Sequence, residues 1–218
     1  PAVDIFDASQ IFRMFAPAFG TDEPCNIHVF PPNARLFELS SHMHKRGKRW
    51  RTFEGAFRCQ GGPAAGSACS PLGYDFASTD VCKGAPCQAS KRVPTVDCDY
   101  SGEVTVDEVV SVVSIALGTG SLDSCKDADT DGDSAVSINE IISGVKALLD
   151  GVPSRVSRDS QDSLLYVSSL YNDPVVLRMN PPMIFPGGKA GEDDRAVTFC
   201  ALYDNGYTDP AEVKTRSG

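Results

Sequence analysis

The chain has 218 residues, of which 41% are hydrophobic, and it carries a formal net charge of −9. This apolar content is sufficient for one sizeable core or two smaller ones. The sequence has no uninterrupted apolar run long enough to span a bilayer and no basic patch with interleaved aromatic residues. We therefore expect neither a membrane span nor nucleic acid as a partner.

Residue patterns in the N-terminal third of the chain predict short strands. Segments 26–30, 35–44 and 50–57 combine β-branched or aromatic residues with alternation. If residues 31–34 form the turn of a hairpin, His28 pairs with Phe37 and lies about five residues along the strand from His42, roughly 17 Å away and on the other face. We therefore interpret His28 as a structural or surface residue.

Two histidines in segment 35–44 are the main candidates for a catalytic metal. His42 and His44 are two residues apart, so an extended strand would project both imidazoles from one face and Met43 from the other. Such a pair can bind one ion of copper, zinc or nickel. The alternative is a pair of half-exposed strand histidines without a metal.

Eight cysteines indicate an oxidising compartment. Proximity along the chain suggests the disulfides Cys59–Cys69, Cys82–Cys87 and Cys98–Cys125, although many other pairings are open. The chain begins at Pro1, without a signal peptide or initiator methionine, and we interpret it as a mature product or a fragment. We expect an extracytoplasmic location, either secreted or periplasmic.

Two twelve-residue stretches, 97–108 and 129–140, have the ligand spacing of calcium loops. Calcium takes about six to eight oxygen ligands, which such a loop supplies from positions 1, 3, 5, 7, 9 and 12. These positions are Asp97, Asp99, Ser101, the carbonyl of Glu103, Thr105 and Glu108 in loop 1, and Asp129, Asp131, Asp133, the carbonyl of Ala135, Ser137 and Glu140 in loop 2. We expect two calcium ions; the alternative is a pair of acidic, solvated turns.

The two loops differ at position 6, where the backbone turns sharply. Loop 1 has Gly102 there, whereas loop 2 has Ser134, for which a left-handed conformation costs about 1 kcal/mol. We therefore expect the second site to be the weaker one. Val104 and Val136, at position 8, are suited to a short strand pairing between the loops.

The loops belong to an internal repeat of 32 residues. Apolar residues follow each loop at identical spacing, which predicts an amphipathic helix after each. They are Val106, Val109, Val110, Val113, Ala116 and Leu117, then Ile138, Ile141, Ile142, Val145, Leu148 and Leu149. Because neither loop has a plausible entering helix, the unit resembles dockerin-type repeats more than a complete EF-hand pair. Residues 93–152 hold 12 acidic and 2 basic residues, against 17 and 18 in the remainder, so the acidity is local to this unit.

Further strands are predicted after the repeat, in segments 164–169, 175–179 and 196–203. We therefore expect a mainly β protein: an antiparallel, jelly-roll-like β-sandwich of residues 1–92 and 153–218, with residues 93–152 inserted as a small α-helical calcium-binding domain. The alternative is two small, independent β pieces, each of which would struggle to bury enough surface.

The β segments resemble a known enzyme family. Residues 37–47, Phe-Glu-Leu-Ser-Ser-His-Met-His-Lys-Arg-Gly, with Cys25 before them and Thr-Phe-Cys-Ala-Leu-Tyr-Asp-Asn-Gly at 198–206, are similar to the C-terminal domain of copper type II, ascorbate-dependent monooxygenases, the peptidylglycine and dopamine hydroxylase group. The resemblance implies a β-sandwich in which His42 and His44 hold one copper ion that activates oxygen for C–H hydroxylation. It also implies that Cys25 and Cys200 form disulfides with partners further along the chain.

The same resemblance implies missing parts. The family takes a methionine ligand from a segment downstream of the strand that matches 196–203, and a second copper from a preceding domain. We expect that C-terminal segment and that N-terminal copper domain to be partners from the same polypeptide, and the present chain alone to be inactive. Two function classes follow: an oxidoreductase domain, or a non-catalytic, calcium-dependent secreted module that binds a protein through its repeat helices. Exposed apolar or Ser/Thr positions on those helices would favour the second.

Overall fold

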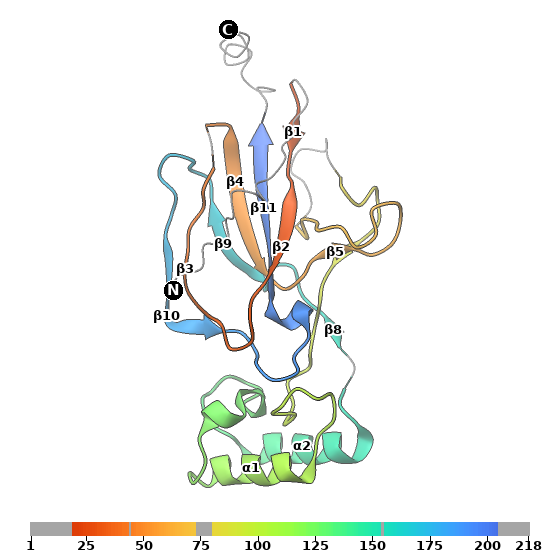
Figure 1. Cartoon of the computed structure of the whole chain (residues 1–218), viewed down its shortest axis with the longest axis vertical. Helices are drawn as coiled ribbons and strands as arrows, with labels where there is room; N and C mark the ends of the chain where they lie inside the picture. The colour runs from red at the N-terminus through yellow and green to blue at the C-terminus, as the bar shows by residue number, and fades with distance from the viewer. Residues whose placement is uncertain (1–18, 44, 73–79, 154, 205–218) are drawn as a thin grey trace.

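The computed structural model describes residues 19–43, 45–72, 80–153 and 155–204. Within them the protein is mainly β, with antiparallel sheets and two α-helices (Figure 1). In chain order the strands are β1 Thr21–Asp22, β2 Cys25–Val29, β3 Arg35–Leu39, β4 Gly47–Glu54, β5 Arg58–Cys59, β6 Cys87–Gln88, β7 Ser90–Lys91, β8 Val156–Ser157, β9 Leu164–Ser168, β10 Leu177–Ile184 and β11 Ala196–Asp204. The α-helices are α1 Val106–Ala116 and α2 Ile138–Asp150, and the short 3-10 helices are η2 Leu122–Ser124, η3 Lys126–Ala128 and η4 Glu192–Arg195.

Strand β11 forms the centre of the larger, five-stranded sheet. It pairs with β1 and β2 along one edge and with β4 along the other, and β9 pairs with β4 beyond it. Every residue of β11 is buried, as expected for a central strand rich in β-branched, aromatic and small apolar residues. This strand therefore anchors the β region.

The second sheet consists of β3 and β10 and packs against the larger sheet. Leu36 and Leu39 of β3 share one apolar cluster with Trp50 of β4 and Phe199 of β11. The rings of Trp50 and Phe199 stack with centroids 5.6 Å apart. Side chains from two sheets thus form the main core.

The hairpin predicted at residues 31–34 is wrong. β2 pairs with β11, and β3 pairs with β10, so the chain crosses from one sheet to the other between them. Phe30 explains the crossing: its amide donates to the carbonyl of Arg195 at 2.8 Å, and its ring stacks on Phe185 with centroids 4.2 Å apart. These contacts hold β2 beside the buried central strand β11.

The repeat lies at one end of the molecule, beyond the sheets (Figure 1). The strands that lead into and out of it, β7 and β8, pair with one another, so its two ends meet. It has an apolar cluster of its own, in which Val96, Val112 and Ala128 are almost completely buried. Residues 93–152, which we call the repeat unit, therefore pack around a separate small core, while the sheets form what we call the β unit.

Four disulfides join the described residues: Cys25–Cys200, Cys59–Cys82, Cys69–Cys87 and Cys98–Cys125. Cys98–Cys125 is a predicted pair, whereas the predicted pairs Cys59–Cys69 and Cys82–Cys87 are wrong. The sulfur atoms of Cys59, Cys69 and Cys82 lie within 4.8 Å of one another, so the fold of the loops decides the pairing, and chain separation does not.

The bond between Cys25 and Cys200 corrects a further expectation, that Cys200 pairs with a cysteine further along the chain. The two residues are register partners across β2 and β11, which brings their side chains together. Four disulfides are typical of proteins that fold in an oxidising compartment. Among the described residues, no helix is both long and apolar enough to traverse a membrane.

Candidate functional site

Loop 1 gathers its carboxylates as the sequence predicted. Asp97, Asp99 and Glu108 each have an oxygen within 4.8 Å of the others. Asp97 is completely buried and accepts hydrogen bonds from the amides of Ser101 at 2.9 Å and Gly102 at 3.0 Å. Glu108 accepts from the amide of Thr105 at 2.8 Å, in the capping box that begins α1. The residue that closes the loop thus also fixes the start of the helix.

Four ligand positions of loop 1 are exposed to solvent: Asp99, Ser101, Glu103 and Thr105. The Ser101 hydroxyl donates to the Glu103 carbonyl at 3.0 Å. The hydroxyl of Thr105, at position 9, donates to Glu108 Oε2 at 2.9 Å. Hydrogen bonds thus link Ser101 to Glu103 and Thr105 to Glu108, while the carboxylates that lie close together are those of Asp97, Asp99 and Glu108.

Loop 2 also gathers three carboxylates, but its last carboxylate, Glu140, is not among them. Asp129, Asp131 and Asp133 lie within the same 4.8 Å limit, and Asp129 accepts from the amides of Gly132 at 2.8 Å and Ser134 at 2.9 Å. The remaining positions, Ala135, Ser137 and Glu140, lead into the capping box that begins α2.

Hydrogen bonds control the ionisation of the last carboxylate in loop 2. Burial works against the charged form of Glu140, but bonds donated by Ser137 and Thr130 outweigh it and lower the pKa of Glu140 from 4.5 to about 2. The Glu140 carboxylate is therefore held ionised and oriented by the loop.

Both loops place residues 4 and 6 in the left-handed region. In loop 1 these are Tyr100, with φ of 61°, and Gly102, with φ of 90°; in loop 2 they are Gly132, with φ of 77°, and Ser134, with φ of 70°. Each loop thus has one glycine and one residue with a side chain in this conformation. The second site was expected to be the weaker one because of the backbone cost of a left-handed Ser134. Tyr100 has the same kind of cost in loop 1, so this cost does not distinguish the two loops.

Val104 and Val136 do not form the predicted pairing strand. Both lie outside regular structure, and both are buried in the core of the repeat unit. Helices that start only two residues later leave too little extended chain for a ladder, so packing of the valines replaces it.

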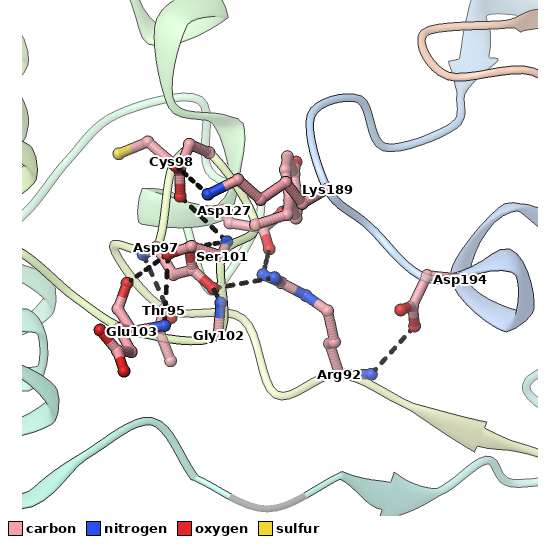
Figure 2. A network of polar contacts seen from close by, with 12 residues as sticks. Arg92, Thr95, Asp97, Cys98, Ser101, Gly102, Glu103, Asp127, Lys189 and Asp194 are labelled. Carbon is pink, nitrogen blue, oxygen red and sulfur yellow. Dashed lines mark hydrogen bonds and ion pairs between the residues drawn. The ribbon is translucent and has the colours of Figure 1, made fainter.

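A network of hydrogen bonds and ion pairs around Arg92 joins loop 1 to the β unit (Figure 2). The guanidinium of Arg92 donates to Asp97 at 3.2 Å and to Asp127, and it lies 4.3 Å over the ring of Tyr100. The amide of Arg92 donates to Asp194, which Arg155 holds through two bonds of 2.8 Å.

Burial shifts the pKa values of two residues in this network. Burial raises the pKa of Asp127, although the Arg92 guanidinium opposes the shift. Burial, with the nearby Asp127 carboxylate, also raises the pKa of Tyr100 to about 12. A cleft of about 490 Å³ lies beside these residues, between the repeat unit and the segment 184–188.

The sequence did not identify this network. Arg92 and Lys189 lie outside the loop motif, and Asp194 is 97 residues from Asp97 in a run of acidic residues without a recognisable mechanism. The sequence does show the charge contrast between the two units. This contrast predicts cationic side chains at their boundary, but it does not say which residues these are.

The repeat helices expose matching apolar faces. Six side chains at equivalent positions, which we call the helix face, have exposed fractions between 58 and 77%: Val106, Val110, Leu117, Ile138, Ile142 and Leu149. Within each helix they are four and then seven residues apart, so they form one stripe. Among the described residues, nothing covers this stripe.

The histidine pair is only partly described. Strand β3 ends at Leu39, so the strand predicted over 35–44 is shorter than expected; its partner β10 begins at Leu177, opposite Leu39. His42 is exposed and Met43 is buried, at 5%, in the main core, while His44 lies outside the described residues. His28 lies on β2 opposite Val197, with its ring 4.6 Å from that of Phe30, and burial lowers its pKa.

Comparison with protein-family models, with curated proteins and with solved structures finds no match to this chain.

Proposed function

We propose that this protein is a calcium-binding, non-catalytic interaction module of an extracytoplasmic compartment, which binds a protein partner through the helix face of its repeat unit. The observation that carries the proposal is the solvent exposure of that face at equivalent positions of both helices. A monomeric protein rarely exposes a contiguous apolar stripe without using it for binding.

The donor sets fit calcium. Each loop offers carboxylate, hydroxyl and carbonyl oxygens at the spacing that a hard cation requires, without nitrogen or sulfur ligands. Calcium, when bound, would balance the charge of the clustered carboxylates. The chain prepares the site itself, since loop amides orient Asp97 and Asp129 and the capping boxes hold Glu108 and Glu140.

The position of the loops explains how calcium would affect binding. Thr105 and Ser137, at position 9 of their loops, are also the N-caps of α1 and α2, on which the helix face lies. A loop that keeps its shape therefore fixes where each helix begins. Without the ion, we expect repulsion among the carboxylates to loosen both helix starts and the stripe with them.

The charge of the repeat unit selects the kind of partner. The repeat unit that carries the apolar stripe has 12 acidic and 2 basic residues, so we expect the complementary surface to be apolar with a basic rim. Steering by such a rim makes the association rate fall as salt increases. We therefore expect a protein partner whose docking surface has Lys or Arg around apolar residues.

Calcium binding is tested by isothermal titration of the whole chain. We expect two ions per chain, one of which is lost in Asp97→Asn and the other in Asp129→Asn. Asp162→Asn, an exposed site outside the loops, removes the same charge and should retain both ions. A titration without uptake in either loop would refute the calcium assignment.

Partner binding is tested with Val110→Glu combined with Ile142→Glu, which places charges at equivalent positions of the helix face. A partner is first captured by the unchanged chain in the presence of calcium and then purified. It should bind the variant at least about 30-fold more weakly than the unchanged chain, which is the effect of losing a hot spot. The control is Phe37→Glu, at a side chain of the β unit that is 59% exposed. Unchanged affinity of the helix-face variant, or binding that persists in chelator, would refute the proposal.

A second candidate is a copper-binding β-sandwich related to the monooxygenases. It is favoured by the packing of β3 and β10 on the larger sheet, and by the exposure of His42 beside a buried Met43, the alternation that a metal pair at 42 and 44 requires. Equilibrium dialysis with copper should find one ion, lost in His42→Ala and in His44→Ala. Copper retained by the double variant would exclude this site.

A further inference from the structure

Among the described residues, loop 1 has hydrogen bonds and an ion pair to the β unit, and loop 2 has neither. The amide of Lys189 donates to the carbonyl of Asp99 at 3.0 Å, and the Lys189 ammonium lies 3.4 Å from the Asp99 carboxylate. Gly188 approaches so closely that a Cβ there would lie 2.3 Å from the same carbonyl. The segment between β10 and η4 is therefore fitted to loop 1 (Figure 2).

The cations at this contact act on two candidate ligands. Lys189 pairs with Asp99, at position 3, and Arg92 pairs with Asp97, at position 1. In loop 2 the hydrogen bonds to the equivalent residues, Asp129 and Asp131, come from amides of the loop itself. Within the described part of the chain, no Lys or Arg side chain pairs with a loop 2 carboxylate.

We infer that calcium binding in loop 1 and docking of loop 1 on the β unit oppose one another through Lys189, whereas loop 2 binds calcium independently. This inference rests on the proposed calcium function. An ion at loop 1 requires the Asp99 carboxylate that Lys189 holds, and it adds positive charge beside Arg92. Loop 1 is then the weaker, regulated site and loop 2 the tighter one, the reverse of the ranking taken from Ser134.

The coupling is reciprocal. If release of Lys189 strengthens calcium binding by some factor, saturation with calcium must weaken the docking contact by the same factor. The Lys189 amide reports on that contact, because it donates to a loop 1 carbonyl across the boundary between the units. Its hydrogen exchange should therefore accelerate when loop 1 fills.

The test uses Lys189→Gln in whole chains with one loop disabled. With loop 2 disabled by Asp131→Asn and Asp133→Asn, the variant should lower the calcium dissociation constant of loop 1 about three- to fivefold, the range for an exposed ion pair. With loop 1 disabled by Asp97→Asn, the same variant should leave the dissociation constant of loop 2 unchanged. Calcium should also accelerate exchange of the Lys189 amide in the first background and not in the second.

Lys126→Gln is the matched control, because Lys126 lies in the repeat unit and pairs with Asp123, which is not a ligand position. If Lys126→Gln and Lys189→Gln change loop 1 affinity equally, the effect is general charge and the inference fails. It also fails if Lys189→Gln has no effect on loop 1, or if calcium protects the Lys189 amide. Absence of calcium uptake by both loops would instead refute the proposed function, and the coupling with it.

Discussion

Gly144 offers a direct test of how the repeat unit is packed. It lies within α2, where alanine would be favoured over glycine by about 1 kcal/mol. A Cβ at this position, however, would lie 2.6 Å from both Val96 methyl carbons. Val96 is 2% exposed and β-branched, so its side chain has no free rotamer to adopt. Overpacking costs about 1–3 kcal/mol, and with two such contacts we take about 3 kcal/mol. Since the gain in helix propensity offsets about 1 kcal/mol of this, Gly144→Ala should destabilise the protein by about 2 kcal/mol.

Urea unfolding followed by far-ultraviolet circular dichroism measures this change, because both α-helices of the described residues belong to the repeat unit. Fluorescence of Trp50, the chain's single tryptophan, follows the β unit in the same samples. Ser143→Ala, at an exposed neighbour in α2, reports the helix propensity alone and should stabilise by about 0.5 kcal/mol.

The compensating change is Val96→Ala. Removing both methyl groups makes room for a Cβ at Gly144, so the double variant should be more stable than the sum of the single effects by at least about 1 kcal/mol. A Gly144→Ala protein as stable as the wild type, or strictly additive effects in the double variant, would refute the packing argument.

Three further predictions concern the rest of the chain. Replacing Cys25 and Cys200 together by alanine should lower the stability followed by Trp50 fluorescence by about 2–5 kcal/mol, because the bond closes a separation of 175 residues; an unchanged midpoint would contradict this. Since folding lowers the pKa of Glu140 from 4.5 to about 2, its contribution is complete above pH 4.5 and is lost as pH falls towards 2. Glu140→Gln should flatten the dependence of helix stability on pH in that window, whereas Glu192→Gln should not. Thr198→Val should lower the free energy of unfolding by about 1–3 kcal/mol. The buried Thr198 hydroxyl accepts from the amide of Phe57 at 2.8 Å and donates to the carbonyl of Gly55 at 2.7 Å. A loss below about 0.5 kcal/mol would count against a stabilising role of these two bonds.

Periodic patterns in the sequence predicted the elements well. The six predicted strands each overlap an observed one, and both helices begin at position 10 of their loops, because alternation and helical spacing are local properties of the chain. Strand pairing was not predictable in the same way. Whether β2 pairs with β3 or β11 depends on which partner buries more surface, and the hairpin inferred from the short turn at 31–34 was wrong.

The repeat illustrates the same division within one unit. Its period of 32 residues predicted equivalent loops and helices, and the structure has both helices, each of which begins with a capping box. The period also pairs Val96 with Ala128 and Val112 with Gly144, so in both pairs the first half has the larger residue and the second half the smaller one. The sequence displays these differences, but only the packing of Gly144 on Val96 gives one of them a reason.

By itself, the sequence determined two loops with clustered carboxylates, the amphipathic helices and a mainly β remainder, because each depends on residues close together in the chain. The tertiary structure decided the disulfide partners, the exposure of the helix face and the contact of loop 1 with Lys189. These depend on which surfaces meet when distant segments pack. Two loops with nearly the same motif therefore have different surroundings, one beside the cations of the β unit and the other held by its own amides.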